Sequence, residues 1–253
     1  MVAIVAQRYR WPLLAIGAAW LVAIWAEVSG VAVSFHHDRL AAGGLPLWAG
    51  ALLLLVAWQV MTVAMMLPSS LPMIRMYAVA SRNKPQRVEG ILLFLGAYFA
   101  VWTAFALVAF FGDAGLHRLV AAWPWLALHT QVILAATFGL AAIYQFTPLK
   151  DACLRTCRHP GAYLMRFYRS GAVGGLKLGF GHAVFCLGCC WALMVVMFAA
   201  GVAHLSWMAL LALIMLIEKT FPNGDRLVVP VGTIFGLLSL TALFAPAFLP
   251  LAA

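Results

Sequence analysis

Three of the five cysteines of this 253-residue chain, Cys186, Cys189 and Cys190, lie close together in one strongly apolar segment. His182 precedes them by about one helical turn. At about 100° per residue of α-helix, these four side chains and Met197 fall on one stripe about 100° wide. Thiolates and thioethers are soft ligands that favour Cu(I), and thiolates also hold zinc. The stripe therefore predicts a soft-metal site, with copper as the expected metal and zinc as the alternative.

A second candidate segment is rich in methionine, and residues 58–72 read WQVMTVAMMLPSSLP. Met61, Met65 and Met66 carry thioethers, so we predict them as auxiliary ligands or as steps on a metal path. Packing is the alternative, because flexible methionine side chains also fill gaps between helices. We expect the two prolines of the segment to break or end the helix and to free backbone carbonyls.

The segment 145–160, QFTPLKDACLRTCRHP, supplies the other two cysteines, Cys153 and Cys157. Residues four apart share a face of an α-helix, so both thiols are expected on one side. We predict that they exchange metal with a soluble donor protein. The alternative is that they are reduced loop thiols without a role.

Four polar residues complete the candidate site, because polar groups within apolar segments are expensive and often functional. They are Gln59, Gln145, Glu218 and Lys219. Glu218 and Lys219 are neighbours in the chain, so we expect them to form an ion pair at a helix end.

The elements that position these residues follow from a composition that is 66% hydrophobic and only 9% charged. Such a chain has too little polar surface to cover a soluble globule. We predict an all-α fold, a polytopic membrane helix bundle that forms one integral membrane domain over residues 1–253. Stretches of about 20 apolar residues can cross a bilayer, and seven are expected at about 12–33, 47–67, 90–111, 126–147, 178–200, 204–221 and 228–249.

The net charge of +9 is explained by the distribution of the basic residues along this pattern. With seven spans, all but Arg39 and Arg118 of the 16 Lys and Arg residues fall on one side, which the positive-inside rule makes cytoplasmic. We therefore predict a cytoplasmic N-terminus, an outer C-terminus and no nucleic-acid partner. All five cysteines then lie on or near the reducing side, so no structural disulfide framework is expected.

The motifs resemble a bacterial family of integral membrane proteins called domain of unknown function 2182, described as predicted metal-binding proteins. The resemblance covers roughly residues 50–222. It rests on four elements of the sequence. These are the methionine segment Trp58–Pro72, the cysteine-containing loop Gln145–Pro160, the specific CxGCCW element Cys186–Trp191 with Gly175 and Gly179 before it, and the pair Glu218–Lys219. It implies a multi-pass protein of the bacterial inner membrane that handles a metal, with copper often suggested.

The leading hypothesis is a membrane protein that binds copper and transfers it across or within the inner membrane, with a soluble or membrane protein as exchange partner. A membrane thiol/disulfide oxidoreductase and a non-catalytic assembly subunit are the alternatives. The chain has no GxxxxGK[ST], GxSxG or HExxH motif. Nothing in the sequence therefore supports a nucleotide-driven pump or a hydrolase, and a role that is not enzymatic is favoured.

Overall fold

The computed structural model describes residues 11–32, 46–199 and 204–246. Within these ranges the chain is helical and has no strand, which confirms the all-α prediction. Three of the basic residues used to predict orientation, Arg8, Arg10 and Arg39, lie outside the described ranges.

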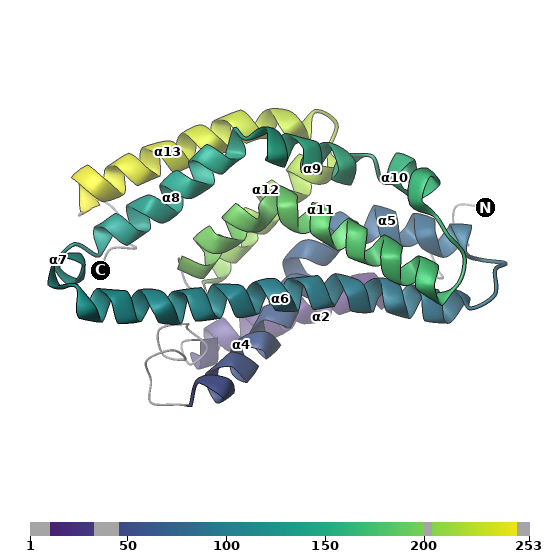
Figure 1. Cartoon of the computed structure of the whole chain (residues 1–253), viewed down its shortest axis with the longest axis horizontal. Coiled ribbons are helices and arrows are strands. Elements are labelled where there is room, and N and C mark those ends of the chain that lie inside the picture. Colours follow the sequence, from purple (N-terminus) through teal and green to yellow (C-terminus); the bar gives the residue numbers. More distant parts are fainter. Residues whose placement is uncertain (1–10, 33–45, 200–203, 247–253) are drawn as a thin grey trace.

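The helices follow one another with short connections, and the longest, α6, runs along the whole molecule (Figure 1). Next to α6 lies α11, while α8 pairs with α13 and α12 lies between these groups. The bounds are α2 Trp11–Val28, α4 Leu47–Met61, π-helix η2 Thr62–Met66, α5 Leu67–Ala80, α6 Arg87–Ala122, α7 Pro124–Leu128, α8 Gln131–Gln145, α9 Pro148–Arg158, α10 Pro160–Phe167, α11 Ala172–Ala199, α12 Leu205–Thr220, 3-10 helix η3 Gly224–Leu227 and α13 Val228–Phe244.

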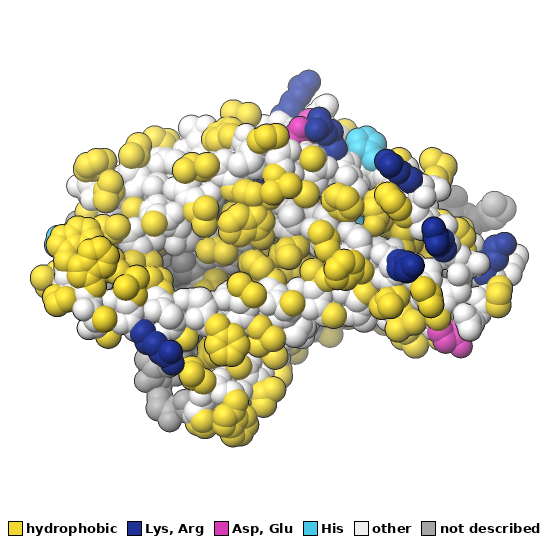
Figure 2. Space-filling view, viewed as in Figure 1, with side chains coloured by type: hydrophobic (Ala, Val, Ile, Leu, Met, Phe, Trp, Pro, Cys, Tyr) yellow, Lys and Arg dark blue, Asp and Glu magenta, His cyan; other side chains and the backbone are white. Residues whose placement is uncertain are grey.

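Five helical segments are long and apolar enough to cross a membrane, or six if the bent pair α8 and α9 counts as one. The sixth stretch that we predicted folds as α12, whose 16 residues rise only about 24 Å against a hydrocarbon core of about 30 Å. Apolar side chains cover much of the visible surface, and most of the visible Lys and Arg gather at the end formed by α5, α9, α10 and the start of α11 (Figure 2). The number of spans and their orientation stay predictions.

Glycines let α6 and α11 approach each other closely. A Cβ atom at Gly175 would overlap the backbone of Gly90, and one at Gly179 would overlap the backbone of Phe94. Small residues of this spacing are common where helices pack in membranes. The contact fixes the start of α11 against the first turns of α6 and so brings Cys186 opposite Tyr98.

The methionine segment does not end where its prolines suggested. A π-helix, η2, joins α4 to α5, and Pro72 lies inside α5. Pro68 has no N–H to give to the Ala64 carbonyl four residues earlier, and the indole of Trp20 donates to that carbonyl instead at 3.1 Å. The expected helix break was therefore wrong, because a π turn accommodates the prolines, whereas the expected freed carbonyl is found at Ala64 and has a partner from α2.

Candidate metal centre

The predicted stripe of α11 faces the interior of the molecule. Cys186, Cys189 and Cys190 are each 1% exposed, and His182 is 6% exposed. All five cysteines are free thiols. The three cysteines belong to one core cluster together with Met61, Met65 and Met66 and with further methionines of α11 and α12, which are Met194, Met197, Met208 and Met215.

Polar groups from three other helices surround Cys186. The Lys219 ammonium of α12 donates to its sulfur at 3.3 Å. The hydroxyl of Tyr98 on α6 lies 3.3 Å from the same sulfur, and the hydroxyl of Ser70 on α5 lies 4.0 Å from it. Ser70 also donates to Tyr98 at 3.1 Å. Cys186 is thus the point at which four helices meet through side-chain contacts.

The other two cysteines form sulfur pairs with neighbouring elements. The sulfur of Cys190 lies 3.8 Å from that of Met66 in η2, and Lys219 donates to Cys190 at 3.5 Å. The sulfur of Cys189 lies 3.8 Å from that of Cys157 in α9. The structure therefore brings together three of the predicted segments, and Lys219 contacts two of the three clustered thiols.

The three cysteines of α11 have different hydrogen-bonding roles. The thiols of Cys189 and Cys190 donate to the backbone carbonyl of Cys186 at 3.1 and 2.8 Å. Cys186 instead faces the ammonium and the two hydroxyls described above. We infer that, of the three cysteines, Cys186 is the one whose sulfur accepts hydrogen bonds.

Helix α9 covers this cluster and carries both cysteines of the predicted exchange segment. Thr147 caps its first turn by accepting from the Lys150 N–H at 3.2 Å. Cys153 packs on Gly188, where a Cβ atom would come within 2.6 Å of the Cys153 sulfur. Cys157 is partly exposed, so it is the outermost thiol of the group. The glycine of the GCCW motif is thus required by the close approach of α9.

The predicted pair between Glu218 and Lys219 is not formed, because the two side chains leave α12 in different directions. Glu218 pairs with Lys150 of α9 at 2.8 Å and accepts from Gln145 at 3.3 Å. Lys150 also donates to the Gln145 side-chain oxygen, and Arg158 donates to the backbone carbonyl of Glu218 at 2.6 Å. This network, which we call the ionic clamp, holds α9 against α8 and α12.

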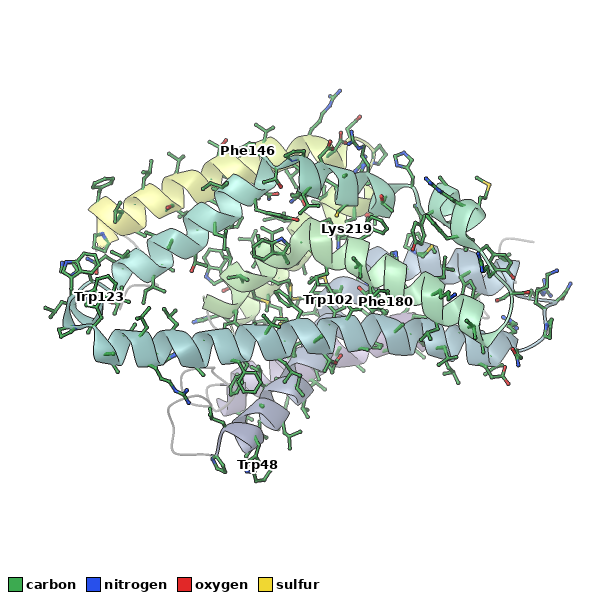
Figure 3. The ribbon with its side chains drawn as sticks, in the orientation of Figure 1. Trp48, Trp102, Trp123, Phe146, Phe180 and Lys219 are labelled. Carbon is green, nitrogen blue, oxygen red and sulfur yellow. The ribbon has the colours of Figure 1, made fainter. Side chains whose placement is uncertain are left out.

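Lys219 lies in the interior of the bundle, whereas Trp48 and Trp123 project at its edges (Figure 3). It is 5% exposed, and in the described ranges no carboxylate forms an ion pair with it. Its polar contacts there are the sulfurs of Cys186 and Cys190. A buried ammonium needs a compensating negative charge nearby. Among the described residues, the sulfurs of Cys186 and Cys190 are the groups in contact with Lys219 that could supply this charge.

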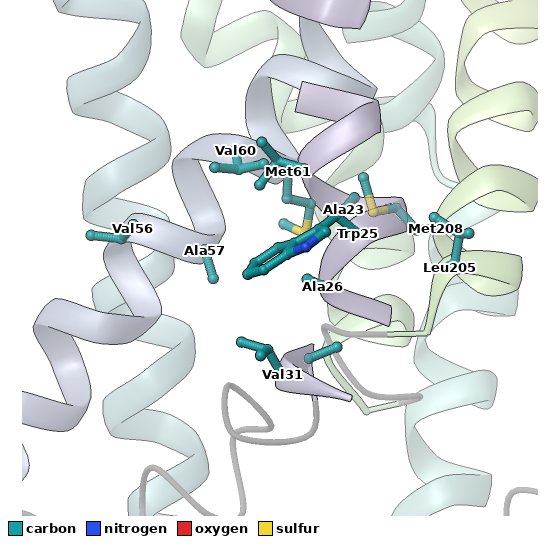
Figure 4. Close-up of a pocket in the computed structure, with 12 residues that line it drawn as sticks. Ala23, Trp25, Ala26, Val31, Val56, Ala57, Val60, Met61, Leu205 and Met208 are labelled. Carbon is teal, nitrogen blue, oxygen red and sulfur yellow. The ribbon is translucent and has the colours of Figure 1, made fainter. Parts of the chain in front are cut away.

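The remaining candidates lie apart from these contacts. His182 is stacked between Phe94 and Tyr98, with both centroid distances 5.9 Å, and its Nε2 has no hydrogen-bond partner among the described residues. Gln59 donates to Thr103 on α6 at 2.6 Å. Met65 is buried in the core, and Met61 lines a separate pocket (Figure 4).

The donor set at the cluster fits a soft ion of low coordination number. No group of three or more His, Cys, Asp and Glu is arranged to hold a metal within the described ranges. The sulfurs lie in pairs instead, 3.8 Å apart. Zinc is not supported, because zinc usually takes four ligands. Pairs of soft sulfur donors suit Cu(I).

Some site residues were missed by sequence reasoning. Lys150 belongs to the PLK element of the loop pattern, but nothing in its spacing pairs it with Glu218. Tyr98 and Ser70 lie in ordinary apolar and turn-like contexts, so no local signal marks them. On α10, Tyr163 packs beside α11 at Gly181, and burial raises the pKa of its phenol.

A family model described as "PpoB2: Copper chaperone" matches residues 55–242. Its name is not that of the family we identified by resemblance, but both imply metal handling. No curated protein and no solved structure matches the chain.

Proposed function

Since the chain belongs to the PpoB2 copper chaperone family, we propose that it is an integral membrane protein that binds Cu(I) at the α11 cysteines and transfers it within or across the bacterial inner membrane. Copper is the cargo here and not a resident cofactor. The observation that carries the proposal is the arrangement at Lys219, where two buried thiols share one ammonium and one of them also contacts a thioether.

Two pairs of sulfur atoms lie at distances that a single Cu(I) ion could bridge. Metal–thiolate bonds are roughly 2.3 Å long, so a single ion can bridge sulfurs up to about 4.6 Å apart. The Cys190–Met66 and Cys189–Cys157 pairs, each 3.8 Å apart, are within this limit. Sites with two or three sulfur ligands leave room for an incoming sulfur, which favours transfer by ligand exchange over permanent storage.

Charge balance gives Lys219 its role. A Cu(I) ion held by the thiolates of Cys186 and Cys190 forms a complex with a net charge of −1. Burying that charge alone is costly, and the ammonium that already contacts both sulfurs neutralises it. We propose that Lys219 is the counter-ion of the loaded site.

Cys157 is the proposed point of entry. It is the outermost thiol, and its sulfur lies 3.8 Å from that of Cys189, which leads to the buried cluster. A soluble or membrane donor protein would pass Cu(I) to Cys157, with Cys153 one turn earlier on the same helix, and from there to Cys189.

The membrane setting is supported by the helices and by the surface. Five helical segments have the length and hydropathy of spans. The basic residues at the α9 and α10 end match a cytoplasmic face in the positive-inside sense (Figure 2). In this orientation the cluster lies near the reducing compartment, where free thiols persist.

The test compares metal content in the wild type and in the C186S/C189S/C190S variant, both purified in detergent from copper-supplemented cells. We expect about one copper ion or more per wild-type chain and the loss of the tightly bound ion in the variant. Unchanged helical circular dichroism and elution volume serve as the folding control. Equal copper in the two folded proteins would contradict the ligand assignment and favour an assembly subunit whose cysteines only pack.

A thiol/disulfide oxidoreductase is the second candidate, and the Cys157–Cys189 contact between two helices favours it. Formation of that disulfide would release two protons and pass two electrons to an acceptor of the quinone class. Alkylation and mass spectrometry after quinone treatment provide the test. A Cys157–Cys189 disulfide that forms and is reduced again in each cycle is expected for an oxidoreductase, and its absence would exclude this candidate.

A further inference from the structure

A pocket of about 240 Å³ lies where α2, α4 and α12 meet, apart from the cysteine cluster. Its wall is apolar, with Val31, Val60 and Ala57 among the lining residues. Three lining side chains offer more than a hydrocarbon surface: the thioethers of Met61 and Met208 and the indole of Trp25 (Figure 4). The pocket therefore combines two soft donors with an aromatic ring.

The three side chains differ in their exposure. Met61 and Met208 are 2% and 4% exposed, whereas Trp25 is 62% exposed. The sulfurs thus belong to the inner wall, and the indole forms the outer rim. In Figure 4 the Met61 side chain ends beside the indole, and the Met208 side chain extends from α12 toward α2. An ion between them would be shielded from water on the inner side and covered by the ring on the outer side.

Two elements carry soft donors from this pocket toward the cysteine cluster, and these residues belong to one buried core. Met66, whose sulfur contacts Cys190, lies five residues after Met61. In an α-helix residues five apart lie about 140° apart around the axis, but the i to i+5 turns of η2 bring them toward the same side. On α12, Met208 shares a face with Met215 and Lys219, since these positions fall within about 40° of one another.

We propose that Met61 and Met208, with the ring face of Trp25, form a second Cu(I) site that takes the ion after it leaves the cysteines. This proposal rests on the proposed function and identifies the receiving end of the transfer. Thioethers bind soft cations such as Cu(I) and carry no charge. An aromatic face attracts a cation placed over it, and the apolar wall disfavours strongly hydrated ions.

The two sites differ in affinity, and a stronger acceptor on the outer side would draw the ion outward through the weaker one. Thiolates attract Cu(I) through their charge, while thioethers hold it more weakly and release it more readily. Thioethers also cannot form disulfides, so they suit a compartment that is oxidising. In the predicted orientation the pocket lies in the outer half of the bundle, at the start of α12 and the end of α2.

The test is an anaerobic titration of the full-length protein in detergent with Cu(I), against a competing chelator. The wild type is expected to bind two Cu(I) ions of different affinity. The M61L/M208L variant should keep the tighter ion and lose the weaker one, because Met→Leu conserves volume and should not disturb folding. The matched control is M73L, which changes a buried methionine in the separate core cluster and should still bind two.

Two further variants separate this inference from the proposed function. C186S/C189S/C190S should lose the tighter ion and retain the weaker one, and if it retains both, the cysteine assignment fails while the pocket site stands. W25L should weaken the second site about two- to fivefold. If M61L/M208L still binds two Cu(I) ions with wild-type affinities, the pocket proposal is overturned. The pocket would then be empty or would hold a co-purified phospholipid.

Discussion

Two lysine side chains are buried in this molecule, and they have opposite surroundings. Lys150 is 1% exposed and meets the carboxylate of Glu218 within the ionic clamp. Lys219 is 5% exposed and meets the sulfurs of Cys186 and Cys190. Glu218 and Lys219 are adjacent in the chain, so one turn of α12 serves both regions.

The difference separates a structural network from a functional one. In the clamp, a fixed negative charge balances the ammonium, and Gln145 takes up further hydrogen-bonding capacity. At the cluster, the balancing charge must come from sulfur, which can also bind a soft metal. The first region should therefore respond to substitution through stability, and the second through copper binding.

The largest effect is expected from Glu218→Gln in the clamp. The substitution leaves the Lys150 ammonium buried without its carboxylate, so the free energy of unfolding should fall by about 3–5 kcal/mol. Chemical unfolding in detergent, followed by circular dichroism, measures the loss. The K150M/E218L double variant is the control, because it removes both charges and should recover most of the stability. A single variant as stable as the wild type would contradict the role assigned to the clamp.

The second prediction concerns Lys219→Met. It removes a buried cation without leaving a carboxylate unpaired, so stability should change by only about 1 kcal/mol. Copper affinity should fall on the order of tenfold or more, because the loaded dithiolate loses its counter-ion. Competition titration with Cu(I) measures this, and the exposed Lys177→Met is the control. Equal affinity in the Lys219 and Lys177 variants would remove the distinction between the two buried lysines.

Gly188→Ala tests the helix that joins the two regions. Its Cβ atom would come within 2.6 Å of the Cys153 sulfur and push α9 away from α11. We expect a loss of about 1–3 kcal/mol in stability from this overpacking. Gly96→Ala is the control, since a Cβ atom there meets nothing within 4 Å. Similar unfolding curves for the two variants would argue against close α9–α11 packing.

The smallest effect on bound copper is expected from Cys157→Ser. If Cys157 is an entry ligand, its loss should slow copper uptake from a donor while the copper bound at equilibrium stays close to that of the wild type. Stopped-flow measurement of uptake from a Cu(I)–chelator complex distinguishes rate from content. Cys153→Ser is the matched control on the same helix, and it should slow uptake less. Wild-type uptake by Cys157→Ser would exclude it from the entry route.

The α11 stripe could be predicted from sequence because helical periodicity alone places its cysteines on one face. The partners could not, because Lys219 and Glu218 diverge by the 100° between consecutive helical residues, and only tertiary packing decides what each meets. The π-helix was also invisible, since its residues follow no pattern that differs from an α-helix. Met208 gave no signal because methionine is common in apolar helices.

The fold could be predicted as all-α from composition and hydropathy. The lengths of its helices could not, because a buried clamp and a bend of 64° between α8 and α9 shorten α8 and redirect the chain. Glycines at 175 and 179 were part of the recognised motif, and the structure gives their reason in the close α6–α11 contact.

Copper K-edge X-ray absorption of the Cu(I)-loaded protein, with one ion per chain, tests the central claim most directly. We predict a shell of two or three sulfur atoms at about 2.3 Å, by analogy with metal–thiolate bonds, which disappears when C186S/C189S/C190S is combined with M61L/M208L to remove the pocket thioethers and is weakened in Lys219→Met. A shell made only of nitrogen or oxygen, or a sulfur shell that survives these five substitutions together, would contradict the account.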